Sequence, residues 1–515
     1  MMIVDMNRSP LPLALFAWCA LVLVGCSLAP KYERADIDPP TSFKEAPVAL
    51  SVDDERDTGS LTIVGTWKIA QPSEQIERGE WWRIFDDATL NDLESVALAE
   101  NQNLKAAIAR VKEARAINET VRAGLVPAIE AGFGPTRQKV SPVSQFQPDG
   151  NDIPAHTLWR AQVGASYEVD LFGRVSDSVR AAEAQVSQSV ALLRSVLLAL
   201  QADVAQSYFN LRELDSEIDV FRRTVVLREQ ALDLVQHRYR EGDISELDVA
   251  RANAELATAR SAEMGVRRMR AASEHSLAVL LGKSPAKFAM AASPLRPVEI
   301  VIPPGLPSSL LERRPDIAAA ERAMAAANAR IGVAKSAYFP SFLLTGAAGF
   351  EAETIGDIFK WSSRTFLLGP LVGTALTMPL FDGGRRKGNL ANARAIYEED
   401  VALYRQQVLT AFREVEDSLS DLRILRGQIQ AQAEAVRASN RAEQLSNTQY
   451  REGAVNYLDV IDAQRTVLQS QRAAVQLSGV QAVASVNLIR SLGGGWGNAP
   501  STTINLHDAE AVSVR

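Results

Sequence analysis

The chain has 515 residues, and its formal net charge of −7 disfavours a nucleic-acid partner, which selects basic surfaces. Apolar residues make up 47% of the chain and charged residues 23%, so disorder of the whole chain is excluded and a large core can be buried. Aromatic residues account for only 6%, while Ala, Leu, Gln, Arg and Glu dominate, a composition typical of helices.

Residues 1–25 have the character of a lipoprotein signal peptide, with translation starting at Met1 or Met6. An apolar stretch of 14 residues ends at Val24, which is shorter than the ~20 residues of a spanning helix. The sequence Leu-Val-Gly-Cys that ends at Cys26 resembles a bacterial lipobox. The resemblance implies that Cys26 becomes the mature N-terminus and carries a covalent lipid such as palmitate, which anchors the protein to outer-membrane lipid. The alternative is an ordinary signal sequence beside a small buried cysteine.

After the signal peptide, residues 26–86 are expected to be an extended segment. No run of 18 or more apolar residues follows, so any membrane span has to consist of strands closed into a barrel. Residues 159–171 alternate apolar and polar side chains, which fits a strand between lipid and a wet lumen or a strand in a soluble sandwich. Three weaker candidate strands are residues 127–136, 340–352 and 366–381. Since a barrel needs about 8 strands or more, several chains have to contribute.

The longest predicted helix covers residues 176–240. Apolar residues recur in it at every seventh position, which predicts a coiled-coil seam. They are Val190, Leu197, Val204, Leu211, Ile218, Val225 and Leu232. A helix of roughly 65 residues measures ~98 Å at 1.5 Å per residue, which is longer than a globular domain requires.

The second half of the chain repeats the first at a shift of 211 residues. Tyr-Arg-Glu-Gly occurs at residues 239–242 and again at 450–453, and Leu-Asp-Val occurs at 247–249 and again at 458–460. We interpret the chain as a tandem duplication, in which each repeat contains a helix, two strands, a long helix and a shorter helix.

This interpretation divides the mature chain into two repeats with flanking segments. The first repeat is residues 87–282 and the second is residues 316–493. A Pro-rich connector, residues 283–315, and a C-terminal tail, residues 494–515, are expected to be extended or loosely packed. The predicted helices are residues 87–124, 176–240 and 243–281 in the first repeat and 316–337, 387–451 and 455–492 in the second.

Three further motifs accompany the repeats. Residues 305–317 read GLPSSLLERRPDI, residues 170–174 read DLFGR and residues 379–385 read PLFDGGR. Together with the lipobox and the duplication, they resemble the bacterial outer-membrane efflux proteins of the TolC type, most closely the OprM-like lipoprotein branch, the NodT family of RND pumps. The resemblance implies a mixed α and β fold. In it, a homotrimer takes four strands from each chain to make a 12-stranded outer-membrane β-barrel, continued by a long α-helical coiled-coil tunnel across the periplasm.

Catalytic chemistry is not indicated by the sequence. The four histidines lack metal-ligand or triad spacing, and no cofactor is expected apart from the lipid on Cys26. Gly282-Lys283-Ser284 matches the end of a phosphate-binding loop, but Leu277 stands where that motif requires glycine.

Four residues of the second hairpin are candidates for a periplasmic gate. Asp459 and Asp462 are three positions apart and share one helix face, and Leu458 and Tyr450 are close in sequence. A pair of aspartates on a helix is most often a solvated face. The resemblance implies instead that these residues line the constricted tip of the tunnel. Six carboxylates from three chains would attract cations there, and closure would respond to pH or divalent ions.

The corresponding positions of the first repeat differ in charge. Asp459 corresponds to Asp248, but Asp462 corresponds to Arg251. We hypothesise that Arg251 or Asp248 bonds across to Asp462 or Tyr450 and latches the gate. The alternative is an Asp248–Arg251 pair within one helix, which contributes only ~0.3 kcal/mol.

The two Tyr-Arg-Glu-Gly turns are candidates for docking the helical tips of an adaptor. The residues are Tyr239, Arg240 and Gly242 in the first repeat and Arg451 and Gly453 in the second. Equally, these turns simply end the helices, because glycine adopts the left-handed conformation that terminates a helix.

The function that the resemblance implies is the exit duct of a tripartite pump that confers multidrug resistance. The duct would work with a periplasmic adaptor (membrane fusion) protein and an inner-membrane RND transporter to expel drugs or other small toxic compounds. One alternative is the exit duct of an ATP-driven (type I) system that exports proteins or small molecules. Another is a non-conducting lipoprotein scaffold, which leaves the paired strands unexplained.

Overall fold

The structure, a computed structural model, describes residues 27–37, 40, 42–45, 79–139, 154–298, 313–368 and 376–494. The predicted signal peptide and the predicted lipid anchor at Cys26 lie outside the described residues. The predicted tail also lies outside them, except for Gly494.

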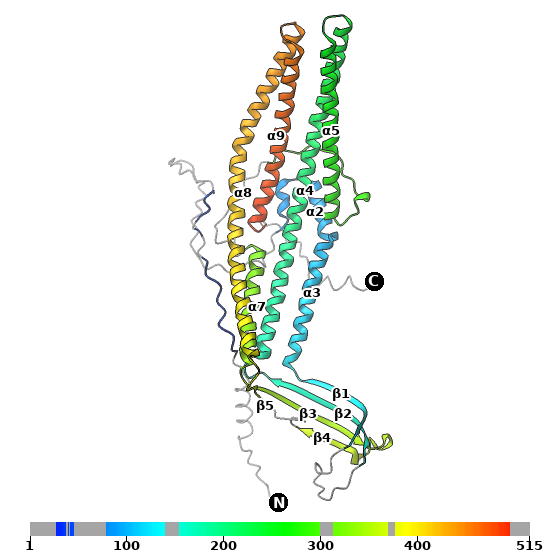
Figure 1. The fold of residues 1–515 in the computed structure, drawn as a ribbon, viewed down its shortest axis with the longest axis vertical. Helices are drawn as coiled ribbons and strands as arrows, with labels where there is room; N and C mark the ends of the chain where they lie inside the picture. Colours follow the sequence, from blue (N-terminus) through cyan, green and yellow to red (C-terminus); the bar gives the residue numbers. More distant parts are fainter. Residues whose placement is uncertain are drawn as a thin grey trace, which may run out of the picture. The chain divides into compact units, whose positions relative to one another are not determined.

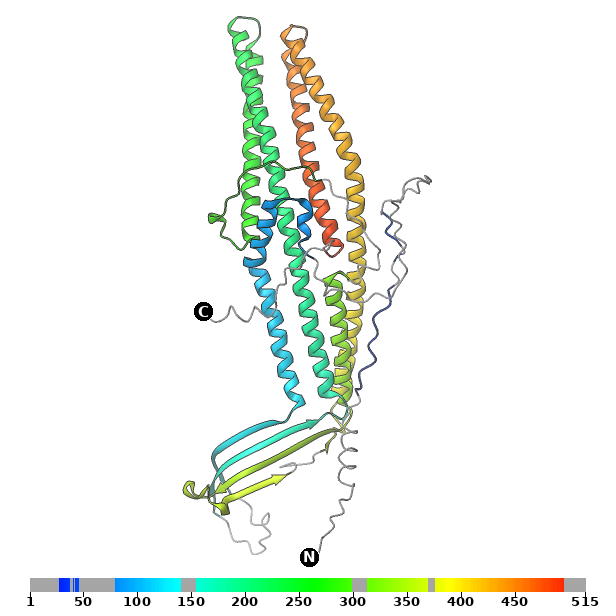
Figure 2. The same cartoon turned by 180° about the vertical axis from the view of Figure 1, so that it is seen from behind.

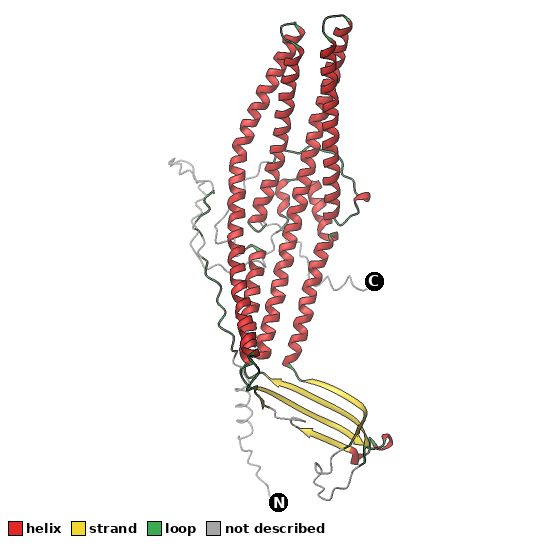
Figure 3. Cartoon of the chain, viewed as in Figure 1, coloured by secondary structure: helices red, strands yellow, loops and turns green. Residues whose placement is uncertain are grey.

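The described elements follow the predicted order of helices and strands (Figure 1, Figure 3). The helices are α2 (Ala88–Glu100), α3 (Gln102–Arg122), α4 (Arg174–Arg240), α5 (Glu246–Leu280), α7 (Pro315–Ser336), α8 (Arg385–Arg451) and α9 (Tyr457–Ser491). The strands are β1 (Ala128–Gln138), β2 (His156–Val169), β3 (Ser341–Ala352), β4 (Arg364–Leu368) and β5 (Leu376–Thr377).

The long helices recur at the shift that the sequence predicts. The helices α4 and α8 are both 67 residues long and begin 211 residues apart. The helices α5 and α9 are both 35 residues long and begin at the same spacing. The two repeats therefore share one plan for their helical hairpins.

The single helix predicted for residues 87–124 is wrong, because the chain breaks at Asn101. This residue has an extended ψ of 127°. Its side-chain oxygen accepts a hydrogen bond from the backbone N–H of Leu104 at 2.9 Å, and its amide donates to the carbonyl of Leu280 at 2.8 Å. Asn101 thus caps the start of α3 and joins it to the end of α5.

The chain divides into two compact units. The first contains residues 1–36, 110–190 and 319–405, and the second contains residues 37–109, 191–318 and 406–515. The helices α3, α4, α7 and α8 contribute residues to both.

In the first unit the strands form an antiparallel sheet in the order β1-β2-β3-β4, and β5 also pairs with β3. Directly opposed residues of antiparallel strands lie on the same face, and Ala161 lies opposite both Phe133 and Phe350. The apolar alternation predicted for residues 159–171 therefore extends across three strands. Its face carries Ile129, Ala131, Phe133, Ala161, Val163, Ala165, Ala348 and Phe350.

The opposite face of the sheet is polar. Arg160 and Glu351 are directly opposed there, and their side chains pair at 3.2 Å. Gln162, Ser166 and Glu168 share this face by the alternation of β2. The sheet thus has one apolar face and one polar face.

The fourth predicted strand, residues 366–381, is shorter than expected at its end. The described parts are β4 and β5, and β5 stops at Thr377. Pro379 follows, and proline has no N–H to donate to a ladder. The side chains of Leu380 and Phe381 are 89% and 91% exposed.

The first unit also holds residues 27–36 of the N-terminal segment, which are extended as predicted. The hydroxyl of Ser27 donates to the buried carboxylate of Asp177 at 2.7 Å, and the amide of Asn328 donates to the carbonyl of Pro30 at 2.9 Å. Arg34 donates to the hydroxyl of Tyr404 at 2.8 Å. These bonds fix residues 27–34 to α4, α7 and α8. Later in the segment the prediction is wrong, because residues 81–85 form the 3-10 helix η1 (Trp81–Phe85) in the second unit, where Trp81 and Trp82 are buried.

The second unit contains a core built around the heptad seam of α4. Val204 and Leu211 are fully buried and pack in one cluster with Trp82, Leu277 and further apolar residues. Figure 2 shows the chain from behind, and along the two hairpins α4 lies beside α5 and α8 beside α9. Long helices are stabilised here by burial of an apolar stripe rather than by propensity alone.

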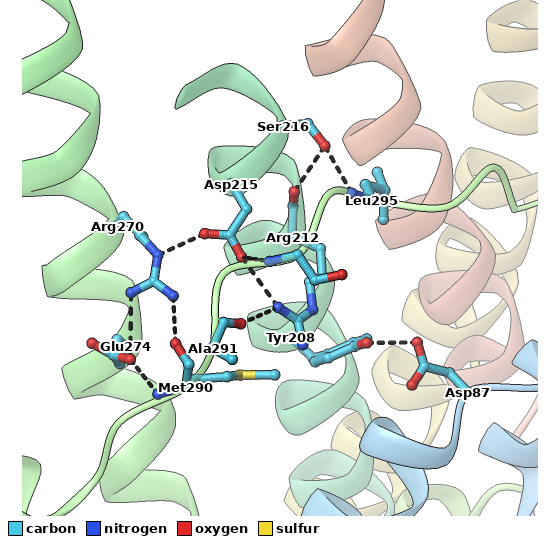
Figure 4. A network of polar contacts seen from close by, with 11 residues as sticks. Asp87, Tyr208, Arg212, Asp215, Ser216, Arg270, Glu274, Met290, Ala291 and Leu295 are labelled. Carbon is cyan, nitrogen blue, oxygen red and sulfur yellow. Dashed lines mark hydrogen bonds and ion pairs between the residues drawn. The ribbon is translucent and has the colours of Figure 1, made fainter. Parts of the chain in front are cut away.

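The connector begins with the short 3-10 helix η4 (Pro285–Lys287). Residues 288–298 are extended, as one of the two expectations had it, and they are firmly held rather than loosely packed. Side chains of α4 and α5 bond to the backbone of residues 290–295 (Figure 4). At the centre, the carboxylate of Asp215 accepts from Arg212 at 3.1 Å, from Arg270 at 2.6 Å and from the N–H of Ser293 at 3.0 Å. Asp215 is buried, and the two guanidinium groups compensate its charge.

Among the described helices, α4 is the one that is long and apolar enough to cross a membrane, by length and composition only. No helical span was expected after the signal peptide, so α4 is an exception by this measure. Its 67 residues far exceed the ~20 that cross a bilayer.

Candidate functional site

The predicted gate and docking residues lie where the two helical hairpins of the second unit turn. Gly242 and Gly453 end α4 and α8 with φ of 82° and 76°, a left-handed conformation that costs glycine no steric clash. The N–H of each glycine bonds three residues back, Gly242 to Tyr239 at 3.0 Å and Gly453 to Tyr450 at 3.1 Å. The glycines therefore terminate helices, as the simpler interpretation of the turns predicts.

A capping box begins α9 after its turn. The side chain of Asn456 accepts from the N–H of Asp459 at 3.2 Å, and the carboxylate of Asp459 accepts from the N–H of Asn456 at 3.2 Å. This reciprocal pair satisfies donors that the helix itself leaves unpaired. Asp459 thus has a structural role besides any role at a gate.

Three of the four predicted gate residues share an exposed face of α9. Leu458 is 40% exposed, the Asp462 side chain is 63% exposed, and Asp459 is also exposed. On the other side of the same turns, Tyr457, Val460 and Ile461 are buried. The first turns of α9 therefore present one apolar and two acidic side chains to the surroundings.

The fourth predicted gate residue, Tyr450, is placed differently. Only 6% of it is exposed, and it packs with Val235, Ala252 and Tyr457 in a cluster that joins both hairpins. Burial raises the pKa of its hydroxyl, Arg238 lowers it and Asp248 raises it. The hydroxyl is buried, and it has no hydrogen-bond partner among the described residues.

The cross-hairpin contact to Tyr450 comes from Arg238. The guanidinium carbon of Arg238 lies 4.9 Å from the ring centroid of Tyr450, a cation–π distance. Its Nη1 also lies 3.5 Å from the Tyr450 carbonyl oxygen. Arg238 was not among the residues that the sequence indicated.

Arg251 and Asp248 form the intrahelical pair that was the alternative to the latch hypothesis. Their side chains are 3.5 Å apart, and Asp248 also accepts from the hydroxyl of Ser245 at 3.1 Å. Within the described protomer, the contact that we expected from Arg251 to the second hairpin is thus made by Arg238 instead.

A second contact between the hairpins is centred on Glu255 of α5, also missed by the sequence. Its carboxylate pairs with Arg228 of α4 at 2.9 Å and with Arg465 of α9 at 2.5 Å. The side chain of Arg228 is 6% exposed and that of Glu255 is 12% exposed. Arg465 also lies 3.6 Å from Asp462, which links this cluster to the exposed acidic face.

The predicted adaptor-docking residues are accessible. Tyr239 is 43% exposed, and Arg240 and Arg451 are exposed as well. Tyr239 corresponds to the buried Tyr450. The equivalent tyrosine is therefore exposed in the first hairpin and packed between the hairpins in the second.

The hairpin ends can hold helices together and attract cations. Within the described ranges, no group of three or more His, Cys, Asp or Glu side chains could hold a metal ion. The chemistry that the site provides is an acidic exposed face beside two charged contacts between hairpins.

Comparison with known proteins shows which family the chain matches. The chain matches the family model described as outer membrane efflux protein over residues 93–283 and 306–494. It is 33% identical over 483 residues to the toluene efflux pump outer membrane protein TtgF of Pseudomonas putida, a match that covers 94% of this chain and 96% of that protein. It is 29% identical over 490 residues to the cation efflux system protein CusC of Escherichia coli, covering 94% and 99%. The crystal structure of a membrane protein from Pseudomonas aeruginosa has a TM-score of 0.80 and 32% identity to it, covering 93% of this chain and 100% of that one.

Proposed function

Because the chain belongs to the outer membrane efflux protein family, we propose that it forms the trimeric, gated exit duct of a tripartite efflux pump. The two matches to the family model lie on the two repeats, and together they contain the strand pairs and all four long hairpin helices. The trimer, the gate, the lipid anchor and the class of substrate go beyond family membership and are part of the proposal.

The observation that carries the proposal is the two-faced sheet of the first unit. Its apolar side exposes large side chains, with Ile129 at 72% and Phe133 at 62%. In the described chain β1 pairs only with β2, and β4 pairs only with β3. Open strand edges are not tolerated in lipid. Three copies would close them as one 12-stranded barrel, with the apolar face to lipid and the Arg160–Glu351 face to the lumen.

The gate in this proposal is the exposed face of α9 at the hairpin turn. Three copies would bring together six carboxylates from Asp459 and Asp462, beside three copies of Leu458. Such a ring favours cations and repels anions. The Arg238–Tyr450 and Glu255–Arg465 contacts would hold the second hairpin against the first while the duct is closed.

Partners of the duct follow from its place in a pump. An adaptor would contact the exposed turns at Tyr239, Arg240 and Arg451, and a proton-driven RND transporter in the inner membrane would supply the compounds. A lipid on Cys26 would hold the N-terminal segment at the outer membrane, next to Ser27, which is bonded to Asp177.

The proposed substrates are small toxic compounds, drugs included. The names of the related proteins refer to toluene and to cations, which differ widely in chemistry, as expected if the transporter rather than the duct chooses. Export by an ATP-driven system remains the alternative within the same architecture. Loss of drug tolerance in a strain that lacks this protein would support the RND pump, and an unchanged tolerance with a defect in a secreted protein would support the alternative.

Single-channel recording of the purified protein in planar bilayers tests the duct itself. We expect a small, cation-selective current from the wild type and a weaker selectivity from Asp459→Asn/Asp462→Asn. Intact trimers that conduct no current in either form would contradict the proposal.

A further inference from the structure

The helices α4 and α9 meet along a line of polar contacts away from the hairpin turns, which we call the α4–α9 seam. It comprises the pairs Asp203–Arg490, Gln206–Asn487 and Glu217–Arg472, together with Glu213 against Gly479. The seam joins the long helix of the first repeat to the last helix of the second. None of its residues belongs to the gate, the latch or the docking surface.

Glu213 occupies a tight place in this seam. A methyl group added at Gly479 would lie 2.5 Å from the Cγ of Glu213, which is closer than atoms can approach. The absence of a side chain at position 479 therefore provides the space in which the Glu213 side chain lies. This contact places the Cβ and Cγ of Glu213 against the backbone of the facing helix, with the carboxyl carbon just beyond them.

A second carboxyl group lies one turn further along α4, at Glu217. Its side chain is 2% exposed and pairs with Arg472 of α9 at 2.6 Å. The guanidinium of Arg472 also lies 5.0 Å from the ring centroid of Phe221. One arginine thus faces two glutamates, and its bond goes to Glu217.

The charged groups acting on Glu213 come from both helices. Glu217 on α4 repels its negative charge, and Arg472 on α9 attracts it. Between Arg472 and Arg490, α9 carries no other charged residue. Burial, followed by the repulsion from Glu217, raises the pKa of Glu213 to about 7.

We propose that the α4–α9 seam is a pH-responsive contact, in which Glu213 takes up a proton when the surrounding medium becomes acidic and the seam then holds α9 more tightly to α4. Protonation of Glu213 removes its repulsion with Glu217, and Arg472 then pairs with Glu217 as its one charged partner in the seam. Deprotonation puts two negative charges within one turn and loosens the seam. The consequence for channel opening rests on the proposed function, whereas the seam itself does not.

The direction of the effect follows from the raised pKa. A carboxyl group whose pKa is higher in the folded state stabilises the fold most when it is protonated. The contribution is complete below the ordinary value of 4.5, is lost as the pH rises toward about 7, and is absent above it. The expected window of response is therefore pH 4.5–7.

Thermal unfolding of the purified full-length protein, followed by loss of helical circular dichroism, tests the seam. Wild type and Glu213→Gln are compared at pH 5 and pH 8, with Glu398→Gln, an exposed carboxyl of α8, as the control. We expect Glu213→Gln to unfold at the wild-type temperature at pH 5 and several degrees higher at pH 8. A change in unfolding temperature that is equal at both pH values, or absent at both, would overturn the proposal. The same pH-dependent change in Glu398→Gln would also overturn it.

A second variant and a recording complete the test. Gly479→Ala removes the space for Glu213, and in this background Glu213→Gln is expected to have less effect at pH 8; an undiminished effect would overturn the role of the seam. In planar bilayers, wild-type open probability should rise several-fold from pH 5 to pH 8, and Glu213→Gln should stay at the low value. If the unfolding temperatures differ with pH but neither protein conducts, the pH-responsive seam stands and the proposed duct is refuted. If the currents of wild type and Glu213→Gln respond equally to pH, the link between the seam and channel opening is refuted.

Discussion

The two helical hairpins share a backbone plan and differ in what they do with it. Both have a 67-residue helix, a turn with a left-handed glycine and a 35-residue helix. The contacts between them, however, use positions at which the repeats differ. At the shift of 211, Arg228, Arg238 and Glu255 of the first hairpin correspond to Ser439, Gln449 and Thr466 of the second.

This difference assigns separate tasks to hairpins of equal shape. The first hairpin is anchored to the connector through Asp215 and supplies the charged side chains that reach across. The second hairpin offers the aromatic ring of Tyr450, the guanidinium of Arg465 and an exposed acidic face. Under the proposed function, this division makes the first hairpin the fixed partner and the second the one that moves when the proposed gate opens.

The largest effect is expected at the anchor of the first hairpin. Asp215→Ala leaves the buried Arg212 without its carboxylate, and loss of one partner of a buried pair costs about 3–5 kcal/mol. Denaturant unfolding should show this decrease in the free energy of unfolding. The matched control is Asp219→Ala, an exposed pair with Arg223 on the same helix, for which less than ~1 kcal/mol is expected. Equal effects of the two changes would show that the Asp215 contacts do not anchor the first hairpin.

A stabilising change is expected in α2. This helix lies before α3, the helix of the first repeat that corresponds to α7 at the shift of 211. Glu94 is fully buried, neither of its oxygens has a hydrogen-bond partner among the described residues, and burial raises the pKa to about 9. Stability from this group is complete below pH 4.5 and is lost as the pH rises to about 9. Glu94→Gln should therefore add roughly 3 kcal/mol at pH 7 and little at pH 4.5. A pH-independent gain in unfolding free energy would show that Glu94 does not titrate this way.

The cross-hairpin cluster should respond to loss of Glu255. Glu255→Gln leaves Arg228 buried with a neutral partner and breaks the pair with Arg465, at an expected cost of about 2–3 kcal/mol. Glu229→Gln, which removes an exposed pair with Arg260, should cost less than ~1 kcal/mol. Chemical denaturation of both variants provides the measurement, and a cost for Glu229→Gln equal to that of Glu255→Gln would argue against the cluster.

A smaller effect is expected from giving the first hairpin the residue of the second. Arg238→Gln removes the cation from the Tyr450 ring and should cost about 1 kcal/mol. Arg251→Ala should cost only ~0.3 kcal/mol, because its pair with Asp248 is intrahelical. The reverse order of the two unfolding free energies would restore Arg251 as the latch.

The smallest stability effects are expected on the exposed acidic face. Asp459→Asn weakens the capping box and should cost roughly 0.5–1 kcal/mol, whereas Asp462→Asn should be nearly neutral. Both should reduce cation selectivity in bilayer recordings. If the double variant keeps its cation selectivity, the residues that make the channel selective must lie elsewhere.

The sequence predicted the elements well because periodicity and glycine turns are local signals. The long helices, the turns at Gly242 and Gly453 and the alternation in residues 159–171 were readable in this way. The break at Asn101 was missed, because its amide bonds to Leu280, which is distant in the chain. Pro379 did mark the early end of the fourth strand, although residues 366–381 were taken as one element.

The candidate site was only partly readable. The exposed face of Leu458, Asp459 and Asp462 follows from spacing on one helix, but the burial of Tyr450 depends on the packing of two hairpins. Arg238 and Glu255 were missed, and the signal that marks them is the difference between the repeats at those positions. Comparing the repeats for differences in charge, as well as for identity, would have found both.

The central claim is that charged side chains of the first hairpin hold the second hairpin closed. Single-channel recording of Arg238→Gln/Glu255→Gln beside Arg251→Ala/Glu229→Gln tests it most directly, because the pairs remove similar charges at different places. We predict that open probability rises many-fold in the first pair and stays at the wild-type value in the second. Equal currents from the two pairs, with trimers intact, would contradict the account.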